Sequence, residues 1–133
     1  MAKIISIANQ KGGVAKTTTT VNLGAALAEA RQRVLLIDLD PQAHLALSLG
    51  LDPDELSAST FDVLTDRSFS LSSITVKIAD DLDLAPADIN LSVAEQRLGG
   101  TIGREQILRD KLRDVQAHYD YILIDCPPSL GVL

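Results

Sequence analysis

The sequence predicts an α/β protein with a mostly parallel sheet flanked by helices on both faces, in three layers. Short apolar runs at residues 4–8, 34–37 and 121–124 are rich in Ile, Leu and Val and are typical of buried strands. Segments with apolar residues at helical spacing separate them, and right-handed crossovers would make these strands parallel. The 133 residues and 46% hydrophobic content fit a single domain over residues 1–133.

The first forty residues predict a strand, a helix and a second strand. We expect the strand at Ile4–Ala8, the helix at Lys16–Ala30 and the buried strand at Val34–Ile37. Gly24 would let the helix approach the sheet closely. The apolar residues of the helix that helical spacing puts on its buried face are Val21, Leu23, Ala25, Leu27, Ala28 and Ala30.

The middle of the chain predicts short elements. The stretch Ser68–Ser73 is polar, and two runs of alternating residues after it are typical of short strands. We expect a turn at Gly50–Pro53. The expected elements are a helix at Gln42–Leu49, a helical turn at Thr60–Leu64, and strands at Ile74–Ile78 and Leu82–Ala85.

The last part of the chain predicts two helices and a third buried strand. These elements are Ile89–Leu98, Arg104–His118 and Tyr121–Ile124, with Asp125 directly after the strand. Three main strands with few helices would leave apolar surface exposed, so we expect the isolated chain to be marginally stable or self-associating. One face of the second helix collects Leu108, Leu112, Val115 and Tyr119.

Composition narrows the class of protein. The net charge of −6 comes without a run of Lys or Arg, so this segment alone is expected to bind nucleic acid poorly. The sequence contains neither an apolar run long enough to span a bilayer nor a signal peptide, which predicts a cytoplasmic location. Cys126 is the single cysteine, which excludes an internal disulfide and predicts a buried apolar role.

A glycine-containing turn follows the first expected strand. Residues 11–18, Lys-Gly-Gly-Val-Ala-Lys-Thr-Thr, open the first helix. Glycines let backbone N–H groups approach phosphate oxygens, and a helix N-terminus adds unsatisfied donors and the positive end of its dipole. Lys16 would reach the β- and γ-phosphates, Thr17 would complete the shell of a Mg²⁺ ion, and Thr18 would donate to the α-phosphate.

The alternative interpretation of this turn is a tight Gly-Gly connection with solvated lysines. Four threonines at 17–20 are poor residues for a helix start, because β-branching restricts χ1, and a need for hydroxyl groups explains them better. The predicted nucleotide-binding residues are Lys11, Gly12, Gly13, Val14, Ala15, Lys16, Thr17 and Thr18.

This loop and two later segments resemble one family. Lys11-Gly-Gly-x-x-Lys16-Thr17-Thr18 is similar to the deviant Walker A box of the ParA/MinD family, which an early second lysine distinguishes. Residues 34–42 resemble the family's second strand and switch I, and residues 121–129 resemble its Walker B strand and switch II. The resemblance is closest to the ParA/Soj partition proteins. It implies a P-loop NTPase fold, of which this chain is an N-terminal portion.

The resemblance implies ATP as the nucleotide and assigns catalytic roles. Lys11 is implied to reach across an ATP-sandwich dimer to the partner's phosphates, where the transition state gains negative charge. Asp40 would position the attacking water. The implied catalytic residues are therefore Lys11, Lys16 and Asp40.

The resemblance also implies a Mg²⁺ site. Asp125 would hold a Mg²⁺-bound water, and Asp38 would support the shell beside Thr17. Aspartate commonly ends strands and begins turns, which is the structural alternative for each carboxylate. Carboxylates that follow parallel strands beside a phosphate loop favour the ligand interpretation, since ligands gather at that edge of open α/β sheets.

The sequence departs from the family pattern at two places. Ala15 stands where glycine is expected before Lys16, and we expect it to be tolerated if its backbone is already helical. Ala43-His44 stands where many members have Gly-Asn. His44 is expected to be an exposed helix histidine, with a pH-sensitive group as the alternative.

The function implied by the resemblance is a dimerisation switch in plasmid or chromosome partition that binds and slowly hydrolyses ATP. The implied partners are a second copy in the ATP state, a ParB-like centromere-binding protein, and non-specific DNA through a C-terminal half; no membrane partner is implied. The location would be cytoplasmic and nucleoid-associated. Two alternatives remain: a redox relative with Cys126 bridging a metal cluster between subunits, and a binding protein without hydrolysis.

Overall fold

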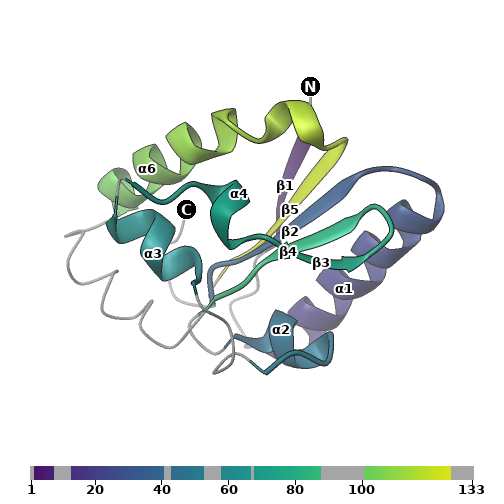
Figure 1. Ribbon diagram of the computed structural model, residues 1–133. Helices are drawn as coiled ribbons and strands as arrows, with labels where there is room; N and C mark the ends of the chain where they lie inside the picture. The colour runs from purple at the N-terminus through teal and green to yellow at the C-terminus, as the bar shows by residue number, and fades with distance from the viewer. Residues whose placement is uncertain are drawn as a thin grey trace.

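A computed structural model of the chain describes residues 2–7, 13–40, 43–52, 58–66, 68–87 and 101–126, with the backbone alone at 13–16 and 101–105. A five-stranded sheet lies between two layers of helices (Figure 1). This arrangement confirms the predicted α/β class. None of the helices in the described part of the chain is long and apolar enough to cross a membrane.

The sheet has the strand order β1-β5-β2-β4-β3. The first four strands in this order are parallel to their neighbours, and β3 pairs antiparallel with β4. The strands are β1 (Lys3–Ile7), β2 (Val34–Asp38), β3 (Val76–Ala79), β4 (Leu82–Ala85) and β5 (Tyr121–Asp125). The helices are α1 (Gly13–Glu29), α2 (His44–Ser48), α3 (Thr60–Thr65), α4 (Leu71–Ile74), α6 (Thr101–Arg113) and the 3₁₀ turn η2 (Gln116–His118).

Each face of the sheet has its own apolar core. Because side chains alternate along a strand, Leu36 packs on the face with α1 and α2, and Leu35 packs on the face with α3, α4 and α6. Figure 1 shows the two helix layers on opposite sides of the sheet. All five residues of β2 are buried, which fits its place as the central strand of the sheet.

The amino ends of β5 and β2 are joined by an ion pair. Arg33 donates its backbone N–H to Asp120 Oδ2 at 2.9 Å, and its guanidinium lies 3.3 Å from Asp120 Oδ1. Asp120 and Tyr121 in turn donate their backbone N–H groups to the carbonyl of Arg33. Both side chains are exposed, so the contact fixes register more than it adds stability.

The strands predicted from the apolar runs are confirmed, with small changes of boundary. The predicted strand Ile74–Ile78 is wrong at its start, because Ile74 ends α4 and β3 begins at Val76. Ser70 caps α4 by accepting from the N–H of Ser73, which gives the polar stretch a helix-starting role.

The predicted helices begin or end elsewhere than expected. The first begins at Gly13 and the second at His44, and the predicted helix Arg104–His118 divides into α6 and η2. Its predicted apolar face is confirmed, since Leu108, Leu112 and Val115 are buried with Tyr119 packed against them. The predicted helix Ile89–Leu98 and the loop residues Lys11 and Gly12 lie outside the described residues.

Gly24 brings α1 against β2. A methyl group at this position would lie 2.8 Å from Leu36 Cδ2, and Leu36 is fully buried. We predict that Gly24→Val lowers the free energy of unfolding by roughly 1–3 kcal/mol through overpacking. Ala26→Val, at an exposed position of the same helix, should cost less than about 1 kcal/mol. If both variants lost the same free energy of unfolding in urea, the close approach of α1 to β2 at Gly24 would be contradicted.

The edge strand β1 is apolar and open. Lys3 N–H and Ile7 C=O bond toward β5, so the backbone groups of Ile4 and Ser6 are directed away from it, and among the described residues β5 is its single neighbour. Ile4 and Ile5 are 41% and 37% exposed.

We therefore predict concentration-dependent association of the 133-residue chain through this edge. Ile5→Lys should shift sedimentation toward the monomer, and Leu47→Lys, at an exposed apolar residue of α2, should not. A monomeric chain whose thermal unfolding is sharp and independent of concentration would refute the prediction.

Candidate functional site

Three parallel strands end side by side at one edge of the sheet, which we call the carboxyl edge. Ile7 of β1 pairs with Asp125 of β5, and Asp125 pairs with Asp38 of β2. The two aspartates therefore occupy neighbouring strand ends, and neither is exposed to solvent. In parallel α/β sheets, ligands bind at this edge.

The first helix begins at the same edge. Gly13, Val14, Ala15 and Lys16 form the first turn of α1, and the structure describes their backbone alone. Ala15 has helical backbone, so an alanine fits there without a left-handed conformation. The first N–H groups of an α-helix have no partner within the helix, and such groups can bind phosphate oxygens.

Thr17 connects α1 to the end of β5. Its side chain is 3% exposed, and its hydroxyl donates to Asp125 Oδ2 at 3.4 Å, a long distance for an O–H···O bond. A hydroxyl and a carboxylate are oxygen ligands that suit Mg²⁺. Within the described ranges, no group of three or more His, Cys, Asp or Glu side chains could hold a metal ion. Mg²⁺ bound mainly by phosphates and waters fits such a site.

Asp38 holds the segment that follows β2. Its Oδ1 accepts the N–H of Asp40 at 2.9 Å, and its Oδ2 accepts the N–H of Leu45, in the first turn of α2, at 3.3 Å. The pKa of the Asp38 carboxyl is raised to about 8, chiefly by burial and also by the charges of Asp125 and Asp40, while the two backbone hydrogen bonds offset part of the rise. Asp38 is thus a buried carboxyl whose two oxygens both have backbone partners.

Asp40 lies two residues past β2 and is 3% exposed. Its carbonyl accepts the N–H of Ala43 at 2.9 Å, and Ala43 has φ 57, in the left-handed region. Glycine adopts this conformation most readily, which explains why a glycine would suit the position. The bond from Ala43 to Asp40 connects the segment after β2 to the start of α2.

His44 and Cys126 lie next to these residues. His44 is half-buried, so the expectation of an exposed histidine is wrong, and among the described residues its buried Nδ1 has no hydrogen-bond partner. Cys126 is buried as predicted, with its Sγ 3.8 Å from the carbonyl of Ile124.

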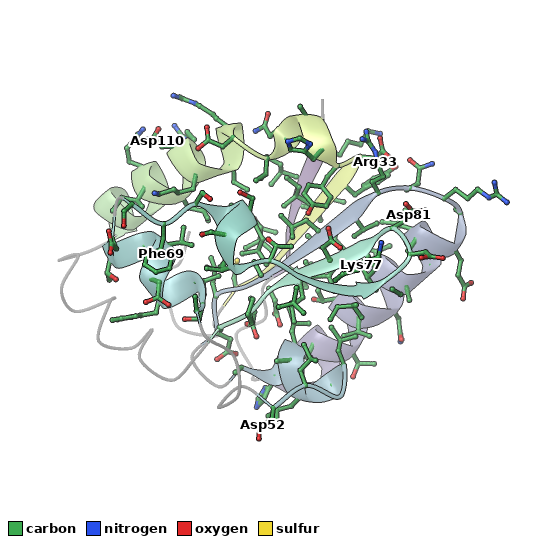
Figure 2. All side chains as sticks on the ribbon, in the orientation of Figure 1. Arg33, Asp52, Phe69, Lys77, Asp81 and Asp110 are labelled. Carbon is green, nitrogen blue, oxygen red and sulfur yellow. The ribbon has the colours of Figure 1, made fainter. Side chains whose placement is uncertain are left out.

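Thr60 belongs to the site and was not predicted from the sequence. Its hydroxyl donates to the carbonyl of Asp38 at 2.9 Å, and the residue is 1% exposed. The Ser59–Asp62 spacing of a capping box predicts a helix start here, but no sequence signal connects Thr60 to β2. Figure 2 shows the side chains packed between the two helix layers.

Comparison with known proteins gives consistent matches over the whole chain. The model of a family described as "AAA domain" matches residues 2–133. The chain is 49% identical to the sporulation initiation inhibitor protein Soj of Bacillus subtilis, covering 100% of this chain and 53% of Soj. It is 46% identical to the chromosome partitioning protein ParA of Caulobacter vibrioides, covering 98% of this chain and 50% of ParA.

Solved structures agree with these matches. A cobyrinic acid a,c-diamide synthase of Mycobacterium smegmatis with bound ATP analog and magnesium has a TM-score of 0.91 and 46% identity, over 98% of this chain and 53% of that one. A plasmid partition protein of Borrelia burgdorferi has a TM-score of 0.80 and 30% identity, over 98% and 58%. The chain thus spans about half the length of the relatives it matches.

The buried carboxyl of Asp38 predicts a pH-dependent stability. Because the folded state raises its pKa from 3.8 to about 8, the folded chain binds this proton more tightly than the unfolded chain. Its contribution is full below pH 3.8 and is lost as the pH rises toward 8. Between these values, metal-free wild type should lose up to about 1.4 kcal/mol per pH unit relative to Asp38→Asn. If the free energies of unfolding of wild type and Asp38→Asn, measured in urea, changed with pH in parallel, the raised pKa of Asp38 would be contradicted.

Proposed function

The chain belongs to the AAA domain family of ParA- and Soj-type P-loop ATPases, and we propose that it is the nucleotide-binding part of an ATP-controlled dimerisation switch. The observation that supports this most is the contact of Thr17 with Asp125. It joins the first turns of a helix that follows a glycine-containing loop to the carboxyl edge of a parallel sheet.

In the proposed site, the N-terminus of α1 binds the phosphates of ATP. Lys16 extends to the β- and γ-phosphates, and Thr18 donates to the α-phosphate. Residues 11–18 would surround the phosphates with backbone N–H groups, which are donors suited to an anion. Lys11 supplies a second positive charge to the nucleotide held by the partner subunit.

The same edge would hold Mg²⁺. Thr17 would contribute its hydroxyl, Asp125 would accept from a water of the ion's shell, and the carboxyl of Asp38 would support that shell. The ion would neutralise negative charge on the phosphates. The structures of the Mycobacterium smegmatis relative contain magnesium together with an ATP analog or ADP.

Asp40 is proposed to orient the attacking water. It lies two residues past the end of β2, where its N–H donates to Asp38 Oδ1 and its carbonyl accepts the N–H of Ala43. A carboxylate in a fixed position orients water at little entropic cost. Hydrolysis then converts an ATP-bound dimer into ADP-bound monomers.

Partition of plasmids or chromosomes is the proposed biological role. The Caulobacter vibrioides and Borrelia burgdorferi relatives are named as partition proteins. A second copy of the chain, a ParB-like protein and non-specific DNA are the proposed partners. The net charge of −6 makes residues 1–133 an unfavourable DNA surface, so DNA contact is assigned to the part of the protein that corresponds to the other half of the relatives.

Nucleotide titration tests the proposed site. Calorimetry should show ATP binding that requires Mg²⁺, and Lys16→Ala should weaken it at least tenfold, about 1.4 kcal/mol. Lys77→Ala removes an exposed lysine of the edge strand β3 and should leave the affinity unchanged. Binding without Mg²⁺, or an equal loss in both variants, would count against the site.

Sedimentation and phosphate release test the switch. ATP should convert the full-length protein to a dimer, ADP should not, and Asp40→Ala should retain the dimer while phosphate release falls. If ATP leaves the protein monomeric, the partition mechanism fails. ATP use that depends on added cobyrinic acid would instead favour the activity for which the Mycobacterium smegmatis relative is named.

A further inference from the structure

Strands β2 and β4 separate at the carboxyl edge. Their pairing ends at Ile37 with Ala85, and the residue after Ala85 is Pro86, which has no N–H. Val34 donates its N–H to Asp81, and alternate residues of a strand direct their backbone groups to the same side, so the carbonyl of Asp38 is directed toward β4. This carbonyl lies where the ladder between the two strands has ended.

Thr60 bridges the two separated strands. Its hydroxyl donates to the carbonyl of Asp38 at 2.9 Å, and its N–H donates to the carbonyl of Pro86 at 2.8 Å. The residue is 1% exposed, so water competes with neither bond. One residue therefore replaces the missing ladder bonds at the end of β2.

Helix α3 holds Thr60 in a fixed place. Ser59 caps the helix by accepting the N–H of Phe61, and Asp62 accepts the N–H of Ser59 at 2.8 Å. Val63 and Leu64 are buried in the core below the helix. A capped and buried first turn leaves the threonine little freedom to move.

Two successive hydrogen-bonding contacts connect Thr60 to Asp40, the residue proposed to orient the attacking water. Thr60 fixes the main chain of Asp38, and the carboxylate of Asp38 holds the N–H groups of Asp40 and Leu45. We propose that Thr60 is a positioning residue that sets the place of Asp38 and Asp40 for ATP hydrolysis. The proposal rests on the proposed function of the site, and it assigns Thr60 no contact with the nucleotide.

The experiment compares three variants in the full chain. Thr60→Val keeps the shape but removes the hydroxyl, and Thr60→Ser keeps the hydroxyl. Thr65→Val is the matched control, because the Thr65 hydroxyl bonds to the Phe61 carbonyl of the same helix and is exposed.

We expect Thr60→Val to lower kcat about tenfold or more, since small displacements of positioned groups have effects of this size, and to leave the affinity for Mg²⁺-ATP within about twofold. Thr60→Ser should restore kcat. A fall in affinity equal to the fall in kcat, an unchanged kcat in Thr60→Val, or an equal fall in Thr65→Val would overturn the proposal.

Amide hydrogen exchange in residues 1–133 supplies a readout that needs no hydrolysis. In Thr60→Val the amides of Asp40 and Leu45 should exchange faster than in wild type, while the amides in the middle of β2 keep their protection. Global loss of protection would show that the threonine only stabilises the fold. If wild type fails to bind Mg²⁺-ATP but exchange responds as expected, the proposed function fails and the positioning contact remains.

Discussion

The parallel pairing of β5 with β2 brings two carboxylates to neighbouring strand ends without solvent exposure, and the site depends on this pairing. Asp38 lies opposite Asp125 in the register, so ionising both would place like charges side by side where they are poorly screened, which contributes to the raised pKa of Asp38. Such a pair persists only where other groups compensate it. Two backbone N–H groups do so for Asp38, and the hydroxyl of Thr17 does so in part for Asp125.

Charged side chains lie in different environments at the two ends of the sheet. At the amino ends of β5 and β2, Arg33 and Asp120 form an exposed ion pair that water can replace at little cost. At the carboxyl edge the aspartates are buried, and their partners are fixed N–H and O–H groups. The buried middle of the sheet separates these ends, and the close approach of α1 at Gly24 keeps the start of the helix aligned with the buried edge.

Sequence patterns predicted the strands well because an apolar run that is buried on both faces leaves a local signal. Val34–Ile37 and Tyr121–Ile124 are of this kind, and the structure places both inside the sheet. The strand predicted at Ile74–Ile78 began too early, because Ile74 ends the short helix α4, which Ser70 caps. No local sequence pattern indicated the role of Thr60. Its hydrogen bond to Asp38 depends on where β2 and β4 separate in the folded sheet. The half-buried position of His44 likewise follows from the packing of α2 on α1, not from its neighbours in sequence.

The two buried aspartates at the carboxyl edge, Asp38 and Asp125, have a direct consequence for ligand binding. In the proposed nucleotide complex, lysine ammonium groups, helix N–H groups and a divalent cation would bring positive charge toward Asp125 and Asp38, so a ligand that recruits them would lower the cost of burying both carboxylates. Binding to the folded state alone stabilises it by RT ln(1 + [L]/Kd), about 2.7 kcal/mol at a hundredfold excess over Kd. The residues that weaken the unliganded fold at this edge are therefore the same residues that strengthen the liganded one. Selection for nucleotide binding can retain buried aspartates that selection for stability alone would remove.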